Sequence, residues 1–164
     1  MILISHRGNT IGPYPKKENH PDYIQDALSF GYDVEIDIWV IEGTYHLGHD
    51  EPQYGVTLQW LNERKDKLWI HCKNYEAIEW FSELESSGSD FNYFWHQEDD
   101  VTLTSMNFIW AYPGKQPIRK SIAVMPEMYN DDISECMGVC WIILRTIKNI
   151  IDECYFCKRT KNGR

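Results

Sequence analysis

The chain has 164 residues, of which 43% are hydrophobic and 14% aromatic, and it carries a formal net charge of −9 at pH 7. This size and composition suit one globular domain with a buried core and exclude a disordered chain. The acidic charge argues against binding to nucleic acid or to an anionic membrane through bulk electrostatics, so an anionic ligand would need a local cation.

Nothing in the sequence predicts a membrane span or an export signal. No apolar run approaches the ~20 residues that cross a bilayer, and the apolar start over residues 2–4 is too short for a signal peptide. The odd number of cysteines indicates free thiols: Cys72, Cys136, Cys140, Cys154 and Cys157. The last four have a spacing that zinc could use, but an apolar helical pattern favours the explanation that Cys140 and Cys154 are small core residues. We therefore expect a cytoplasmic protein.

The first half of the chain alternates predicted strands with predicted helices. Apolar runs predict strands over Ile2–Ser5, Tyr32–Val40, Leu68–Lys73 and Tyr93–His96, and a short extended piece over Tyr45–Asp50. Helical spacing of apolar residues predicts helices over Pro21–Phe30, Leu58–Lys65 and Tyr75–Glu85, with Asn19 or Asp22 capping the first and Thr57 the second. A strand, a helix and a strand in succession form a βαβ unit, so we expect the first two strands to be parallel.

After His96 the alternation stops, because too few residues remain between apolar runs for crossover helices. The expected elements are extended chain over Val101–Leu103, strands over Phe108–Trp110, Ile122–Met125 and Met137–Cys140, and an amphipathic helix from Trp141 to about Cys157. Residues 158–164 form a basic tail. The sequence therefore predicts a single domain over residues 1–157 that is followed by this tail.

Two carboxylates on the second predicted strand point to a metal site. Glu35 and Asp37 are two residues apart, so on a strand their side chains face the same way. The surrounding residues are apolar and aromatic, which indicates that both faces of the strand are buried. Because two neighbouring buried carboxylates repel each other and lose hydration, a divalent cation is the usual remedy.

Other predicted strands also end in polar residues. His6 and Arg7 follow the first strand, His71 and Lys73 end the third, and His96 ends the fourth. Because ligands bind at the carboxyl ends of strands in parallel α/β architectures, we expect these side chains to share one site with Glu35 and Asp37.

Four motifs resemble those of a known family: His6-Arg7-Gly8, Glu18-Asn19, Glu35-x-Asp37 and His49-Asp50. Their order and spacing are similar to those of the glycerophosphodiester phosphodiesterases, which belong to the phosphatidylinositol-phospholipase-C-like phosphodiesterases. The resemblance covers about residues 1–75. It implies an α/β fold, here a reduced (β/α) barrel of the TIM type, because 164 residues are fewer than the ~250 of a complete barrel. The crossover helices missing after His96 explain the shortening.

The resemblance also implies an activity, the metal-dependent hydrolysis of a glycerol-type phosphodiester in lipid metabolism. It gives His6 and His49 the roles of general acid and base, and it gives Arg7 the role of holding the phosphate. Lys73 would add positive charge against the transition state. In one implied route, a neighbouring hydroxyl of the substrate attacks first and forms a cyclic phosphate intermediate.

For the metal, the resemblance implies that Glu35 and Asp37 bind Mg²⁺ or Ca²⁺ and that Glu18 orients Arg7 or joins the metal ligands. The chain departs from the family at His71, where the family usually has a glutamate. His71 either ligates the metal through nitrogen, which favours Mn²⁺ or Zn²⁺, or contacts the phosphate. Glu127 is a candidate for the missing oxygen ligand. The alternative function is that of a catalytically impaired barrel that binds a phosphate-containing ligand.

A second departure lies at residues 138–141, where the expected polar residue, such as aspartate, is absent. The expected partner of the protein is a small phosphodiester and neither a nucleic acid nor a membrane. The sequence does not predict an oligomeric state.

Overall fold

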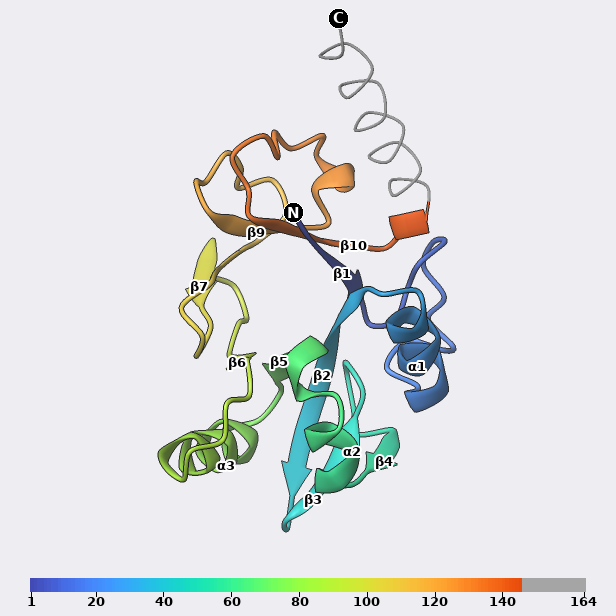
Figure 1. Ribbon diagram of the computed structural model, residues 1–164, viewed down its shortest axis with the longest axis vertical. Helices are drawn as coiled ribbons and strands as arrows, with labels where there is room; N and C mark the ends of the chain where they lie inside the picture. The colour runs from blue at the N-terminus through green and yellow to red at the C-terminus, as the bar shows by residue number, and fades with distance from the viewer. Residues whose placement is uncertain (146–164) are drawn as a thin grey trace, which may run out of the picture.

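The structure, a computed structural model, describes residues 1–145. Its main feature is a mixed sheet of ten strands that curls into part of a barrel (Figure 1). Seven of these strands are parallel and lie in the order β8-β9-β10-β1-β2-β5-β6. Their bounds are β1 Ile2–His6, β2 Asp33–Ile41, β5 Leu68–Cys72, β6 Tyr93–Phe94, β8 Ile109–Ala111, β9 Ser121–Val124 and β10 Gly138–Trp141.

Three further strands are antiparallel to their neighbours. β3 (Thr44–Leu47) folds back on the second half of β2, and β4 (Tyr54–Val56) pairs with β3. β7 (Val101–Leu103) pairs with β8. The chain reverses after β2 at Glu42 and Gly43, both of which have positive φ values, 48° and 74°. This tight turn produces a hairpin at the place where a βαβ unit would continue into a helix.

The described residues contain three α-helices, α1 (Pro21–Ser29), α2 (Leu58–Asn62) and α3 (Tyr75–Ser86). Two single 3₁₀ turns, η1 (Lys65–Lys67) and η2 (Pro126–Met128), are also present. Thr57 caps α2 as predicted, because its side chain accepts a hydrogen bond from the backbone N–H of Trp60. The predicted cap of α1 is wrong, since His20 and not Asn19 or Asp22 caps that helix.

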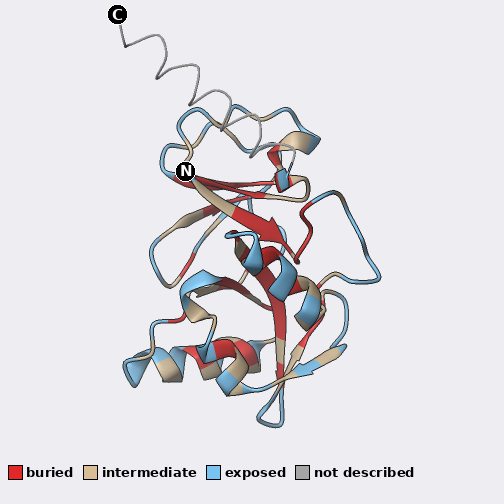
Figure 2. Cartoon of the chain, turned by 45° about the vertical axis from the view of Figure 1, so that its right-hand side comes forward, coloured by how far each residue is buried: buried red, intermediate tan, exposed pale blue. Residues whose placement is uncertain are grey.

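The two faces of the curled sheet bury two different clusters. On the outer face, Val34 and Ile36 of β2 pack with Ile24 of α1, Leu61 of α2 and Phe81 of α3. On the inner face, an aromatic-rich cluster contains Ile4, Trp69, Phe94, Trp110 and Cys140. Figure 2 shows the buried residues concentrated along the central strands and on the helix faces turned toward them. Val34 to Ile38 of β2 are all buried, so both faces of this strand are covered, as the apolar and aromatic residues around it predict.

The predicted TIM-type barrel is wrong. A TIM barrel alternates eight parallel strands with eight helices, whereas residues 1–145 contain three α-helices and three antiparallel strands. The chain instead forms a curled, mixed half-barrel. The difference arises because β2 continues into a hairpin and because no α-helix lies between β6 and β10, where the connections contain loops and the 3₁₀ turn η2.

Other sequence predictions have mixed outcomes. The predicted parallel pairing of the first two strands is confirmed by the alignment of β1 with β2. Most of the predicted C-terminal helix, the domain boundary at residue 157, the tail 158–164, Cys154 and Cys157 lie outside the described residues. Cys72, Cys136 and Cys140 are free, and both Cys72 and Cys140 are buried. No helix in residues 1–145 is long and apolar enough to cross a membrane.

Candidate functional site

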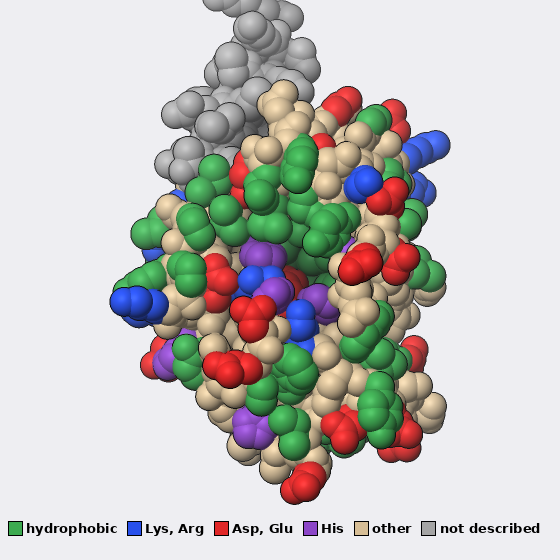
Figure 3. Space-filling view, turned by 180° about the vertical axis from the view of Figure 1, so that it is seen from behind, with side chains coloured by type: hydrophobic (Ala, Val, Ile, Leu, Met, Phe, Trp, Pro, Cys, Tyr) green, Lys and Arg blue, Asp and Glu red, His purple; other side chains and the backbone are tan. Residues whose placement is uncertain are grey.

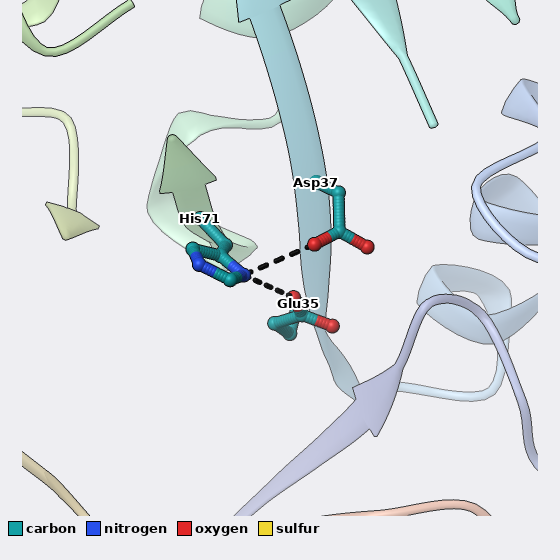
Figure 4. Close-up of side chains that lie close together, drawn as sticks. All are labelled: Glu35, Asp37 and His71. Carbon is teal, nitrogen blue, oxygen red and sulfur yellow. Dashed lines mark ion pairs between the residues drawn. The ribbon is translucent and has the colours of Figure 1, made fainter. Parts of the chain in front are cut away.

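Three side chains on adjacent strands form a compact group of potential metal ligands: Glu35, Asp37 and His71 (Figure 4). The register places Asp37 of β2 directly opposite His71 of β5, and Glu35 lies two residues before Asp37 on the same face. Their potential ligand atoms all lie within 4.8 Å of one another. Glu35 is 2% exposed and Asp37 is fully buried. This arrangement brings two carboxylates and one imidazole together away from water.

The hydrogen bond on the far side of the His71 ring fixes its tautomer. Its Nε2 lies 2.8 Å from the backbone carbonyl of His96, and a carbonyl only accepts, so Nε2 carries the proton. Nδ1 therefore faces the carboxylates, 3.0 Å from Asp37 Oδ1 and 3.9 Å from Glu35 Oε1. The ring also stacks on Phe94, with the ring planes 8° apart. A histidine that donates one ring N–H to a carbonyl presents its other nitrogen as a metal ligand.

Some buried polar atoms in this group lack hydrogen-bond partners, as expected of atoms that would bind a cation. Glu35 Oε2 and Asp37 Oδ1 are buried and make no regular hydrogen bond, although Asp37 Oδ1 lies at ion-pair distance from His71 and Lys73. Burial, and next the charge of Asp37, raise the pKa of Glu35 to about 8. Burial also acts to raise the pKa of Asp37, but His71, Arg7 and Lys73 outweigh it and hold that pKa below its usual value. A divalent cation would satisfy both oxygens, so the donor set fits one.

Arg7 lies at the end of β1 and connects two acidic groups. Its Nε is 2.9 Å from Asp37 Oδ2, and its Nη1 is 3.3 Å from Glu18 Oε2. Burial acts to lower the pKa of Arg7, but the charges of Asp37, Glu35 and Glu18 raise it above its ordinary value. Arg7 has a positive φ of 55°, and Gly8 after it packs against Tyr23, where a Cβ would approach a ring carbon to 2.8 Å. The glycine therefore permits the close turn that aims Arg7 at the carboxylates.

Asn19 is a site residue that the sequence analysis considered only as a helix cap and a motif member. Its Nδ2 donates to Asp37 Oδ2, its Oδ1 accepts from the backbone N–H of Asp37, and both distances are 2.9 Å. Asn19 is 1% exposed and has a positive φ of 63°. The only sequence signal for a role of Asn19 in the site is its position next to Glu18 in a loop. Its pairing with Asp37 depends on tertiary structure.

We expect that replacing Asn19 with Gly weakens divalent-metal binding by roughly 10- to 100-fold, the usual cost of removing a group that orients a metal ligand. Glycine tolerates the positive φ, so the change removes the side chain without straining the backbone. Calorimetric titration with Mn²⁺ and Mg²⁺ measures the effect. Asn62→Gly, at the exposed end of α2, is the control. Equal metal affinity in the two variants would show that Asn19 does not contribute to metal binding.

Beside the buried group opens a cavity of about 490 Å³. Its polar lining consists of His6, Arg7, His49, His71, Lys73, His96, Gln97 and Glu98. Figure 3 shows this hollow, with histidine, lysine and arginine side chains gathered in it. The structure therefore brings four sequence-predicted residues that carry acid–base or phosphate-binding chemistry, namely His6, Arg7, His49 and Lys73, to one opening.

The two predicted catalytic histidines differ in their surroundings. His6 is 8% exposed, its Nδ1 has no hydrogen-bond partner, and its Nε2 is 3.9 Å from Glu35 Oε2. Burial, and next the charge of Arg7, lower the pKa of His6 to about 3, so the ring is neutral at neutral pH. The side chain of His49 is 39% exposed, and its Nδ1 is 2.6 Å from Asp50 Oδ1. The Nδ1 atom of His6 thus has no hydrogen-bond partner in the protein, and Asp50 orients His49.

Glu18 and Glu127 lie outside the three-residue ligand group. Glu18 contacts Arg7 and accepts a hydrogen bond of 2.8 Å from Asn9 Nδ2, so it orients the arginine. Glu127 of η2 accepts a long bond of 3.4 Å from the backbone N–H of Ile142, while its Oε2 is buried without a partner. Burial raises the pKa of Glu127. Its place in the structure therefore gives no contact with Glu35, Asp37 or His71.

We expect the metal-free protein to lose stability as the pH rises toward 8. The pKa of Glu35 rises from 4.5 to about 8 in the folded protein, so folded Glu35 holds a proton that the unfolded chain releases between these values. His6 acts in the opposite direction, because its pKa falls from 6.5 to about 3 on folding and its effect is complete above pH 6.5. The loss is therefore clearest between about pH 6.5 and 8.

Glu35→Gln removes this titration and should raise the free energy of unfolding at pH 8 by roughly 1–3 kcal/mol, the scale of an unsatisfied buried group. Urea unfolding at pH 6.5 and pH 8 in the presence of a chelator measures the difference. Glu42→Gln, at an exposed position just after β2, is the control. Parallel pH profiles of wild type and Glu35→Gln would contradict the assignment.

No family model, no curated protein and no solved structure matches this chain. The four-part motif resemblance and the geometry of the site are therefore the two grounds for a function.

Proposed function

We propose that this protein is a divalent-metal-dependent phosphodiesterase that hydrolyses a glycerol-type phosphodiester. The observation that supports the proposal is that Glu35, Asp37 and His71 Nδ1 lie together beside a cavity. That cavity is lined by His6 and His49, which can transfer protons, and by the positively charged side chains of Arg7 and Lys73. The motif resemblance supplies the reaction class, and the geometry supports it.

Glu35, Asp37 and His71 would hold the metal, with two carboxylate oxygens and one ring nitrogen. When bound, a Mg²⁺, Ca²⁺ or Mn²⁺ ion supplies positive charge that stabilises the phosphate oxygens. The nitrogen of His71 makes Mn²⁺ a better candidate than it would be at an all-oxygen site. Asn19 and Arg7 hold Asp37 in place by contacts of 2.9 Å on the oxygen that faces away from His71.

Arg7 and Lys73 would bind the phosphate. Both line the cavity and both reach Asp37, so their charges are fixed before a substrate arrives. Cations held in advance at the place where negative charge develops lower the barrier without reorganisation. They also supply the local positive charge that an anionic substrate needs against the net charge of −9.

His6 and His49 would transfer protons. His6 lines the cavity and its ring is neutral, so the ring can accept a proton from an attacking hydroxyl or water. The Nδ1 of His49 is held by Asp50, which leaves its Nε2 to exchange a proton with the leaving or attacking oxygen. Attack by a neighbouring hydroxyl of the substrate, with a cyclic phosphate intermediate, uses the same two groups.

A second candidate is a catalytically impaired protein that binds a phosphate-containing ligand. The observation in its favour is that His71 stands where the resemblance implies a third carboxylate.

We propose the cytoplasm as the compartment, because the thiols of Cys72, Cys136 and Cys140 are free.

The test is turnover of glycerophosphoethanolamine by protein that has been stripped of metal and resupplied with Mg²⁺, Ca²⁺ or Mn²⁺. We expect release of ethanolamine or of glycerol only in the resupplied samples. Binding of inorganic phosphate without turnover of any glycerophosphodiester would support the second candidate instead.

A further inference from the structure

The cavity has two chemically different sides. The carboxyl ends of β1, β5 and β6 and the loop after β3 bring the charged and histidine side chains described above. The ends of β8 and β9 bring only weakly polar or apolar residues, which we call the apolar wall: Trp110, Tyr112, Pro113, Val124 and Met125. A ligand that fills this cavity therefore meets cations on one side and hydrocarbon on the other.

The base of the apolar wall is packed in place. Trp110 is 4% exposed and Val124 is 6% exposed. The indole ring of Trp110 lies 4.7 Å from the ring of Phe94 and 5.8 Å from that of Trp69, measured between centroids. Because these contacts already hold the side chains of the wall in place, little conformational entropy is lost when a ligand packs against them.

The apolar surface continues outward from the wall. Tyr112 is 44% exposed, and Tyr129, which is 63% exposed, packs against the backbone of Gly114 just after Pro113. Figure 3 shows hydrophobic side chains gathered along one side of the hollow that holds the histidine, lysine and arginine side chains. Exposed apolar surface that adjoins a polar site marks a place where an apolar part of a ligand binds.

We propose that the substrate is an amphipathic phosphodiester, in which one of the two ester groups is an alkyl chain that lies on the apolar wall. This inference rests on the proposed function and adds the class of substrate. Arg7 and Lys73 bind the phosphate, and the chain covers Val124, Met125 and Tyr112. The cavity of about 490 Å³ exceeds the volume of a phosphate group and leaves room for such a chain.

The chemistry of the wall disfavours a second hydroxyl-rich ester group at that position. A hydroxyl that leaves water for this surface needs a replacement hydrogen bond, and among the five residues of the wall only Trp110 and Tyr112 carry a side-chain polar group. A methylene group loses nothing there and gains from burial. The glycerol-type group therefore belongs on the polar side, where Gln97, Glu98 and His49 line the cavity.

The test is a series of methyl alkyl phosphates with ethyl, butyl, hexyl and octyl chains, titrated calorimetrically into the full chain in Mg²⁺. We expect the dissociation constant to fall by roughly two- to four-fold for each methylene that reaches the wall. The double variant Val124→Thr with Met125→Gln should flatten this dependence, because it replaces apolar groups of the wall by polar ones of similar size. The control, Leu103→Gln, changes a 58% exposed residue of β7 that does not line the cavity, and it should keep the full dependence.

Affinities that do not change with chain length, or octyl esters that bind no better than ethyl esters, would overturn the inference. Turnover of glycerophosphoethanolamine is measured on the same preparations. Turnover with no chain-length effect would reject the amphipathic substrate but keep the phosphodiesterase. A chain-length effect without turnover of either glycerophosphoethanolamine or the octyl ester would reject the phosphodiesterase but keep the amphipathic ligand.

Discussion

Asp37→Asn should lower the affinity for divalent metal by roughly 10²-fold or more and abolish hydrolysis at ordinary Mg²⁺ concentrations. The expected loss exceeds the 10- to 100-fold typical of a group that merely orients a ligand, since Asp37 is itself one of the proposed ligands. It lies 2.9 Å from Arg7 Nε, 3.0 Å from His71 Nδ1 and 3.5 Å from Lys73 Nζ. Removing its charge therefore weakens the proposed metal site and the ion pairs of Asp37 with Arg7 and Lys73.

Asp33→Asn is the matched control, because Asp33 lies on the same strand but its carboxylate contacts Lys67 and Trp69. Circular dichroism should show that both variants are folded, and calorimetry with Mn²⁺ then reports the metal affinity of each. A strong chelator should reproduce the loss of activity in the wild type. Unchanged turnover by Asp37→Asn, or full activity in excess chelator, would reject metal-dependent hydrolysis.

His6→Ala and His49→Ala should each lower kcat by roughly 10²- to 10⁴-fold, the usual contribution of a positioned acid or base. Both side chains line the cavity, His6 with a free ring nitrogen and His49 with its other nitrogen held by Asp50. Because neither belongs to the proposed ligand group, metal affinity should change far less than kcat. This separation distinguishes proton transfer from metal binding.

His46→Ala is the control for this pair, since His46 lies on β3, bonds to Thr44 and does not line the cavity. Its kcat should match that of the wild type. Wild-type turnover by either His6→Ala or His49→Ala would exclude the mechanism with two histidines.

Local patterns in the sequence determined most of the elements as far as Ser86. Apolar runs predicted β1 and β5, alternating apolar residues predicted β2, and helical spacing predicted α1, α2 and α3 within a few residues. The same alternation placed Glu35 and Asp37 on one face of β2, because side chains two residues apart on a strand point the same way. These features follow from short-range geometry, so the sequence alone was sufficient.

The sequence alone did not determine how the sheet ends. The barrel inferred from resemblance has parallel strands, yet β3 and β7 pair as antiparallel strands. Whether a strand turns back or crosses over depends on the conformation of a few turn residues, such as Glu42 and Gly43, and on which edge is free. Such a choice is a property of the whole sheet, so no local pattern encodes it.

Only the tertiary structure gave the site its chemistry. The sequence listed the histidines and carboxylates, but the hydrogen bond from His71 to the carbonyl of His96 and the bonds of Asn19 to Asp37 join residues 25 and 18 positions apart. The apolar wall likewise joins residues at the ends of β8 and β9 to polar residues that follow β1, β3, β5 and β6. Residue types are fixed by sequence, whereas tautomers, the protonation of Glu35 and the neighbours in a cavity depend on which distant atoms the fold brings within a few ångströms.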